Sequence, residues 1–468
     1  MRLAPLLLAL LATLPAAAAE PTRIPEAALD TAAQLRGVAL ADDTAWKVTE
    51  SLTTEVGPRV AGSDADARAV EWAKAKFAEL GFDKVWTEPV TFPKWERRSQ
   101  RAEVVGPHAQ PLVVSALGGS AGGTVEAQVV RFPDLESLQA AAPGSLAGKI
   151  AFVDYRMERA QDGHGYGRGS RVRGAGPSAA ILAGASAFLM RSAGTDSHRF
   201  AHTGMTRYAE GLAPIPAAAL SNPDADQLAR LLALDRATRV RLALDCGWDG
   251  EYTSQNVIGE ITGSTRPDEI VLIGGHLDSW DEGTGAIDDA AGIGISMAAA
   301  RLIADLPVRP ARTIRVVAFA NEEQGLHGGF AYARAHADEL VKHAIVSESD
   351  FGAGRIYGFD AGVADHAGAA IRQIAAALAP LGIEWRPGEG DPESDVGPYA
   401  GAGAAWAWLG HDGTQYFDLH HTPDDTLDKI DPKTLAQNVA AYAVFTYLAA
   451  QAEGDFGSSP ARAVNERR

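Results

Sequence analysis

The sequence predicts an α/β fold: a three-layer αβα sandwich with a mixed, largely parallel central sheet, plus an inserted β-rich domain. After Trp248, continuous apolar runs alternate with amphipathic helical stretches. Strands that helices cover on both faces read as continuous apolar runs, because neither face meets water. Between Val113 and Leu244 the pattern changes to short strands, glycine turns and small helices. We therefore expect an insert over residues 113–246, within a main domain of residues 20–112 and 247–454.

The segment before the insert predicts one clear helix and one strand. From Asp64 to Leu80, apolar residues recur at helical spacing, and Gly81 suits the left-handed position that ends a helix. Val85 to Val90 is typical of a strand. Within the insert we expect strands over residues 125–130, 149–154 and 188–190, and a helix of small residues over 179–187.

After the insert, the predicted elements alternate as the fold class requires. Buried strands are expected over residues 269–273, 313–320 and 344–347, and helices over 292–306 and 330–336. The last helix opens at Asp431-Pro432, because proline favours the first helical position. The polar tail over residues 455–468 is expected to be disordered.

The N-terminus is typical of a secretory signal. Arg2 precedes an apolar run over residues 3–14, and Ala17-Ala18-Ala19 fits a small-residue cleavage site. The run is shorter than the ~20 residues that a membrane-spanning helix needs. We expect a cleaved signal peptide over residues 1–19, no membrane span, and a periplasmic or extracellular protein.

The net charge and the cysteine content limit the binding partners and the kinds of metal site that the chain can have. A formal net charge of −18 argues against nucleic acid and anionic lipid as partners, because both would repel the chain. Cys246 is the only cysteine, which excludes an intrachain disulfide and a zinc site built from cysteines. A lone cysteine after an apolar run is more often part of the core than a nucleophile. Any metal site must therefore use histidine and carboxylate side chains.

The most informative stretch is Asn321-Glu322-Glu323, at the end of a predicted buried strand. Adjacent carboxylates repel each other, so a fold retains them mainly where positive charge lies nearby. His276 follows the predicted strand over 269–273, and Asp350 follows the one over 344–347. The carboxyl ends of parallel strands share one edge of a sheet, where open α/β proteins bind ligands. The sequence therefore predicts metal-assisted hydrolysis at that edge.

The spacing within two further motifs suits metal binding. In Gly274-Gly275-His276-Leu277-Asp278, the aspartate lies on the same side of an extended chain as the histidine. Its carboxylate can accept the proton of the far ring nitrogen and so fix the tautomer. In Gly285-Ala286-Ile287-Asp288-Asp289, two carboxylates immediately precede a helix. One can bridge two metal ions, and the other can brace the loop.

These motifs resemble those of the co-catalytic di-zinc exopeptidases in metallopeptidase family twenty-eight. Five motifs occur in the family's order: the three above, Glu348-Ser349-Asp350, and His421-Thr422-Pro423-Asp424-Asp425-Thr426. Val56-Gly57-Pro58-Arg59 extends the resemblance toward the start, so that it covers most of the chain. The resemblance implies the zinc-exopeptidase type of αβα fold, a peptide substrate and two divalent metal ions, expected to be zinc.

The resemblance also implies the metal ligands. One ion would be held by His276, Asp288 and Asp350, and the other by His421, Asp288 and Glu323. Asp288 would then bridge the two ions. His420 is an alternative to His421, and the family's pattern, with the ligand directly before the threonine stretch, favours His421.

The remaining roles in the centre concern protons and support. Glu322 would be the general base that takes a proton from water held between ions ~3.5–4 Å apart and returns it to the leaving amine. Asp278, which orients His276, is counted with the catalytic residues. Asp289 would brace the ligands from behind, and the Asp288–Asp289 peptide bond is expected to be cis.

The insert resembles a protease-associated domain through Ala147-Gly148-Lys149-Ile150, Gly184-Ala185-Ser186-Ala187 and Ile215-Pro216-Ala217-Ala218-Ala219. Arg171-Val172-Arg173-Gly174, Arg191-Ser192 and His202-Thr203-Gly204 resemble the subgroup around carboxypeptidase Q.

Substrate contacts are expected from both domains. Asp395, in an acidic run, would bind a substrate amine. His202 would contact the substrate, with a structural histidine as the alternative. Dipeptidase action would need a cation for the substrate carboxylate, which Arg171, Arg173 or Arg191 could supply.

Two other function classes stay open. A glutaminyl cyclase on a related fold would use a single zinc ion, and a non-catalytic binding protein would have lost ligands. The sequence does not decide between aminopeptidase, dipeptidase and carboxypeptidase action. It also leaves the oligomeric state open, with a homodimer as one candidate.

Overall fold

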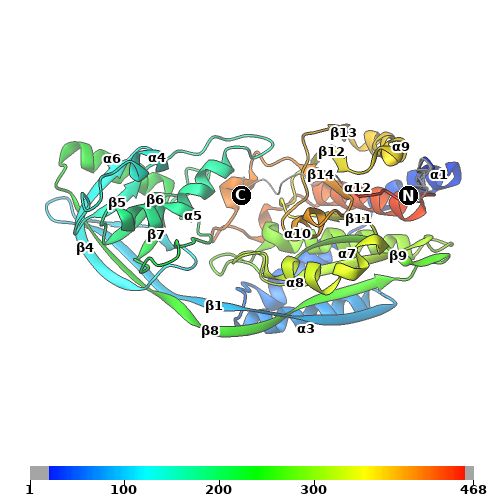
Figure 1. The fold of residues 1–468 in the computed structure, drawn as a ribbon, viewed down its shortest axis with the longest axis horizontal. Coiled ribbons are helices and arrows are strands. Elements are labelled where there is room, and N and C mark those ends of the chain that lie inside the picture. The colour runs from blue at the N-terminus through cyan, green and yellow to red at the C-terminus, as the bar shows by residue number, and fades with distance from the viewer. Residues whose placement is uncertain (1–19, 459–468) are drawn as a thin grey trace, which may run out of the picture.

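The structure, a computed structural model, describes residues 20–458, so the predicted signal peptide lies outside the described residues. Figure 1 shows two bodies joined by a long two-stranded ribbon. Strands β1 (Lys84–Val105) and β8 (Arg239–Ile261) form this ribbon. They pair antiparallel from Lys84 opposite Glu260 to Val105 opposite Arg239. One body is the main domain, and the other is the insert.

The main domain is built on a mixed sheet. Its other strands are β9 (Arg266–His276), β10 (Arg312–Phe319), β11 (His343–Glu348), β12 (Ile356–Gly362), β13 (Glu384–Trp385) and β14 (Trp406–His411). Their order is β13-β12-β14-β11-β9-β10-β8. The pairs β9/β10, β9/β11, β11/β14 and β12/β13 are parallel, whereas β10/β8 and β12/β14 are antiparallel. This confirms the predicted mixed, largely parallel sheet.

Helices cover both faces of this sheet. One face carries α1 (Glu26–Ala39), α2 (Thr44–Ser51), α3 (Asp64–Glu79), α7 (Ala291–Ala304), α9 (Gly368–Leu378) and α12 (Pro432–Gln451), and the other carries α8 (His327–Ala335) and α10 (Gly397–Gly401). Val271 and Ile273 of β9 pack in the first core, and Leu272 packs in the second. Because both faces are buried here, residues 270–273 of β9 form a continuous apolar run, as the three-layer prediction requires.

The insert extends the sheet beyond β8 through an antiparallel partner strand, and two further cores lie there. Its strands are β3 (Val114–Ala116), β4 (Gly123–Phe132), β5 (Ile150–Val153), β6 (Ala187–Arg191) and β7 (Ala217–Leu220), with β2 (Gln110–Leu112) on the ribbon. Strands β4 to β7 are parallel neighbours, and β3 pairs antiparallel with β7. Its helices are α4 (Leu135–Gln139), α5 (Tyr166–Leu182) and α6 (Asn222–Leu234).

The boundary that we predicted after Cys246 falls inside β8, because one continuous strand runs through both bodies. Cys246 is buried and free, in agreement with a role in the core. The strand predicted over residues 85–90 is the start of the much longer β1. That length was missed because Pro93 and the polar run over residues 96–101 interrupt the strand pattern in the sequence.

Helix α5 corrects the prediction for residues 179–187. It begins at Tyr166 and ends at Leu182, and Gly184 follows it with a φ of +89°. Its glycine-rich first half has low helix propensity. Close packing explains one of these glycines, because a Cβ at Gly176 would lie 2.3 Å from the ring of Phe188.

The C-terminal segment is ordered further than expected. Phe456 is fully buried, and its carbonyl accepts a hydrogen bond from the Ala364 amide. The disorder predicted from Asp455 onward is therefore wrong for residues 455–458, and residues 459–468 lie outside the described part. Between residues 20 and 458, no helix has the length and apolar character needed to cross a membrane.

Asn256 on β8 ties the sheet to the loop that carries the paired glutamates. Its side-chain oxygen accepts from the Ala320 amide at 2.9 Å, and its nitrogen donates to the Gly328 carbonyl at 3.0 Å. Asn256 is fully buried.

We expect Asn256→Leu to lower the free energy of unfolding by about 2 kcal/mol or more, because it leaves a buried donor and a buried acceptor unpaired. Glu251→Ala, at an exposed position of the same strand, should change it by less than about 0.5 kcal/mol. Urea unfolding of both variants provides the measurement. Equal stabilities would show that Asn256 does not tie the loop to the sheet.

Candidate metal centre

Three neighbouring parallel strands deliver the predicted residues to one edge of the sheet. His276 ends β9 opposite Phe319, the last residue of β10. Glu348 ends β11 opposite Gly274, so Asp350 emerges beside His276. Glu322 and Glu323 follow β10 directly. The expected convergence at the carboxyl edge is thus present in the structure.

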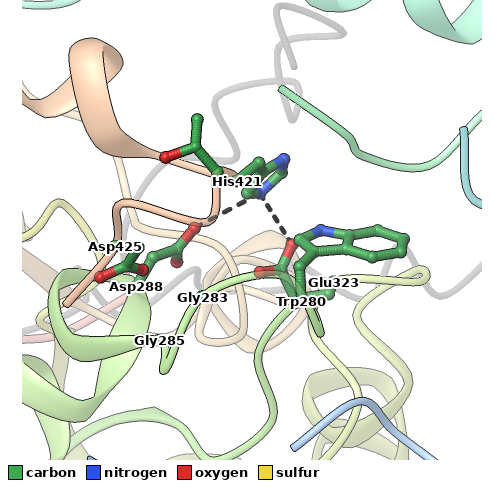
Figure 2. Close-up of a pocket in the computed structure, with 8 residues that line it drawn as sticks. Trp280, Gly283, Gly285, Asp288, Glu323, His421 and Asp425 are labelled. Carbon is green, nitrogen blue, oxygen red and sulfur yellow. Dashed lines mark ion pairs between the residues drawn. The ribbon is translucent and has the colours of Figure 1, made fainter. Parts of the chain in front are cut away.

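Asp288 lies between two groups of ligands. Its Oδ1 is 3.0 Å from Nε2 of His276, which is also 3.4 Å from Oδ1 of Asp350. Its Oδ2 is 3.3 Å from Nε2 of His421, which is also 2.9 Å from Oε2 of Glu323. In Figure 2, dashed lines join the His421 ring to the carboxylates of Asp288 and Glu323. The two oxygens of one carboxylate therefore face two separate histidines.

The charges in this cluster fit divalent cations. Burial raises the pKa of Glu322 well above its usual range, and Asp350 and Glu323 raise it further. Burial also acts to lower the pKa of His276, but the nearby carboxylates of Asp278, Asp288 and Asp350 outweigh it and hold that pKa well above its usual range. In the protein alone, protons supply the positive charge that the carboxylates need. Imidazole and carboxylate are ligands that zinc accepts, and Oε1 of Glu323 has no partner among the described residues. The donor set thus fits two metal ions.

Asp289 braces the loop behind this cluster. The Asp288–Asp289 peptide bond is cis, as expected. The Asp289 carboxylate is fully buried and accepts from the amides of His276 and Gly292, both at 3.1 Å. A Cβ at Gly275 would lie 2.3 Å from Asp289 Oδ2, so glycine leaves the room that this carboxylate occupies.

Asp278 supports the centre differently from the prediction. Nδ1 of His276 donates to the backbone carbonyl of Asp278 at 3.0 Å, whereas the nearer carboxylate oxygen is 3.6 Å away. The Asp278 carboxylate instead accepts from the Glu322 amide at 3.0 Å. The tautomer is therefore fixed by a carbonyl, and the carboxylate positions the glutamate loop. Spacing alone does not reveal this, because it does not distinguish a backbone oxygen from a side-chain oxygen.

His421 matches the predicted ligand better than its neighbour. Nε2 of His420 is 3.6 Å from Oδ2 of Asp288, and these two residues could hold an ion together with His421. The two rings stack with centroids 3.5 Å apart. His421 contacts Asp288 and Glu323 together, which is the pattern a second metal site requires.

The loop that carries Asp288 is held by two residues for which the sequence predicted no role. Asp425 accepts from the amides of Ala286 and Ile287 at 2.8 and 2.7 Å, and burial raises its pKa to about 7. The buried guanidinium of Arg59 donates to the carbonyls of three loop residues: Leu277, Thr284 and Gly285. Both residues lie in stretches that carried the family resemblance, which was the only available signal.

Asp395 is buried rather than placed in an open acidic loop. Its Oδ1 accepts from the Gly329 amide at 2.9 Å, in the first turn of α8. Its Oδ2 has no partner within the described residues. Burial, then the nearby Glu348 and Glu322, raises its pKa well above the usual range. Its predicted contact with a substrate amine stays a prediction.

The structure argues against His202 as a substrate contact. The ring is buried, with Nδ1 donating to the His420 carbonyl at 2.8 Å and Nε2 lying 2.6 Å from Oδ1 of Asp196. Both nitrogens are therefore engaged within the protein, and the alternative of a structural histidine is favoured.

Comparison with known proteins agrees with this geometry. The model of peptidase family M28 matches residues 256–446. Carboxypeptidase Q from Homo sapiens is 34% identical over 405 residues, which cover 86% of this chain and 84% of that protein. The crystal structure of a peptidase M28 precursor from Shewanella amazonensis SB2B is 50% identical with a TM-score of 0.91, covering 93% of this chain and 99% of that chain.

A zinc aminopeptidase from Bacillus subtilis is 21% identical with a TM-score of 0.60, covering 86% of this chain and 94% of that chain, which shows a shared fold. The predicted fold class is therefore confirmed. The extent of the match to carboxypeptidase Q also confirms the resemblance found in the sequence motifs. The chain belongs to peptidase family M28.

Proposed function

We propose that the protein is an exported, zinc-dependent exopeptidase that hydrolyses dipeptides or short peptides with water activated by two metal ions. The observation that supports this most directly is the position of Asp288, whose two oxygens face His276 and His421 separately. A single-metal centre would not need a carboxylate in that position. Export rests on the signal-like sequence of residues 1–19.

The ligands divide into two sets that share one residue. One set is His276, Asp288 and Asp350. The other is His421, Asp288 and Glu323. Two ions bound there would lower the pKa of a shared water and polarise the scissile carbonyl.

The surroundings of Glu322 support its proposed role as the general base. Asp278 holds its backbone amide, while its carboxylate makes no hydrogen bond or ion pair within residues 20–458. Burial and the neighbouring carboxylates raise its pKa, which makes its ionised form a stronger base. With divalent cations offsetting the nearby negative charge, that form could take a proton from water and deliver it to the leaving amine.

Arg173 supports recognition of a free substrate carboxylate. Of the three arginines considered from the sequence, Arg191 pairs with Asp154 and Asp226, and Arg171 pairs with Glu136 at the surface. Arg173 is buried without an acidic partner in the described chain, and its Nε has no acceptor there.

The surroundings of Arg173 place it beside the metal centre. Its Nη1 donates to the Thr203 carbonyl at 3.2 Å, and the same carbonyl lies 3.1 Å from Nδ1 of His421. Its Nη2 donates to the Tyr166 hydroxyl. Figure 1 shows α5, which carries Arg173, on the side of the insert that faces the main domain. Arg173 would bind the free carboxylate of the substrate, and the unpaired oxygen of Asp395 would bind its free amine. Together they favour a dipeptide whose two ends are both free.

Glu322→Gln should retain both metal ions and lower kcat by about 100- to 10,000-fold, because the amide cannot accept the proton. Steady-state kinetics together with metal analysis tests this. Glu389→Gln, at an exposed loop position, should leave kcat unchanged. A Glu322→Gln enzyme with near-normal kcat would show that another group is the base.

Removing metal with a chelator should abolish amino acid release from dipeptides, and about two equivalents of zinc should restore it. The assay also separates the alternatives. A glutaminyl cyclase would form cyclised product and need a single ion, and a binding protein would release nothing. Full activity in chelator-treated, metal-free protein would contradict the proposal.

Arg173→Met should lower kcat/KM by about 10- to 100-fold for dipeptides with a free carboxylate, and far less for the matching dipeptide amides. The reason is that only the dipeptide with a free carboxylate loses a charged hydrogen bond to Arg173. Arg171→Met, two residues away on the same helix, is the matched control and should leave the acid-to-amide ratio unchanged. If Arg173 only steadied the Thr203 carbonyl, both substrates would slow by the same factor.

A further inference from the structure

The predicted metal ligand His421 has a backbone conformation that needs support. Its φ is +60°, in the left-handed region that residues other than glycine adopt at some cost. The residue lies just after the short helix α11 (Tyr416–Leu419) and is buried. Something outside this segment must hold the chain in this conformation.

The support comes from the insert. The Thr203 amide donates to the His421 carbonyl at 3.0 Å, and Nδ1 of His421 donates to the Thr203 carbonyl at 3.1 Å. Nδ1 of His202 donates to the His420 carbonyl at 2.8 Å. We call these four residues, His202, Thr203, His420 and His421, the clamp. Its two halves are 218 residues apart in sequence.

The clamp determines which ring nitrogen of His421 faces the centre. A carbonyl oxygen can only accept, so the hydrogen of the imidazole lies on Nδ1. Nε2 is then the nitrogen with a free lone pair, and it is the one that faces Asp288 and Glu323. Hydrogen bonds of this kind orient metal-binding histidines and raise their basicity.

The insert side of the clamp is firmly built. Nε2 of His202 is paired with Asp196, whose Oδ1 also accepts from the Asn222 side chain at 3.2 Å. The His202 amide donates to the Ser192 hydroxyl at 2.9 Å. A Cβ at Gly194 would lie 2.3 Å from the His202 ring, so the ring packs directly against the backbone of Gly194. The His202 ring, held in the insert, therefore fixes the position of the His420 carbonyl through their hydrogen bond.

The other predicted metal site does not depend on the insert in this way. Nδ1 of His276 donates to the Asp278 carbonyl, and Asp350 follows β11, so both ligands belong to the main domain. A defect in the clamp should therefore affect one site and spare the other.

We infer that His202 is a positioning residue through which the insert controls metal binding at the site formed by His421, Asp288 and Glu323. This rests on the proposed two-metal function. It also gives the insert a task in the chemistry beyond substrate contact, and it explains why His202 is buried rather than exposed in the substrate path.

The test is a competition titration of metal-free protein with zinc against a chromophoric chelator. The wild-type chain should take up about two equivalents. His202→Leu should weaken the binding of one equivalent by about 10- to 100-fold and leave the other unchanged. His198→Leu, at an exposed histidine of the same loop, is the matched control and should behave like the wild type.

A second variant protects the test against misfolding. Asp196→Asn keeps the shape of the partner but removes its charge, and it should give the same selective loss in smaller degree. Thermal unfolding in chelator shows whether each variant is folded. Unchanged affinity at both sites, or an equal loss at both, would overturn the inference. A wild-type uptake of one equivalent would overturn the two-metal proposal itself, and this inference with it.

Discussion

The structure depends on holding several carboxylates close together inside the protein. Asp288, Glu323 and Asp350 meet within a few ångströms of two imidazoles, and Glu322 stands beside them with a raised pKa. Such an arrangement is unfavourable without positive charge. Three features hold these carboxylates in place against their mutual repulsion. They are the register of the sheet, the hydrogen bonds from Arg59 to loop carbonyls, and the hydrogen bonds that Asp425 accepts from loop amides. The centre is thus prepared for cations before they arrive.

Much of this could be predicted from the sequence, because it follows from periodicity and topology. The apolar runs around His276 and Glu322 indicated parallel strands, and parallel strands deliver their ends to one edge. What could not be predicted depends on atoms rather than spacing. The carbonyl of Asp278 replaces its carboxylate at His276, and Asp395 is buried under α8. His202 was assigned to the substrate because sequence gives no sign that Asp196 and the His420 carbonyl occupy its ring.

The insert reaches the centre through a small number of polar contacts. Arg97 on the ribbon donates to the Thr203 hydroxyl and pairs with Asp281 and Glu282, which lie in the loop after β9. Trp280 in that loop packs edge-on against His421, with ring centroids 5.9 Å apart. Its indole nitrogen has no acceptor among the described residues. The residues that line the pocket belong to the main domain, and the insert supports two of them, Trp280 and His421, from behind.

The ribbon has a consequence for biosynthesis. The Lys84 side chain on β1 donates to the Glu260 carboxylate on β8, 176 residues later. Strand β1 therefore cannot pair with β8 until the whole insert has been synthesised. Contacts this distant in the chain slow folding, because a long loop must close before they form. The core that lies between Leu117 and Ala219 can form in the meantime. The order of synthesis thus favours folding within the insert before β1 and β8 pair in the main domain.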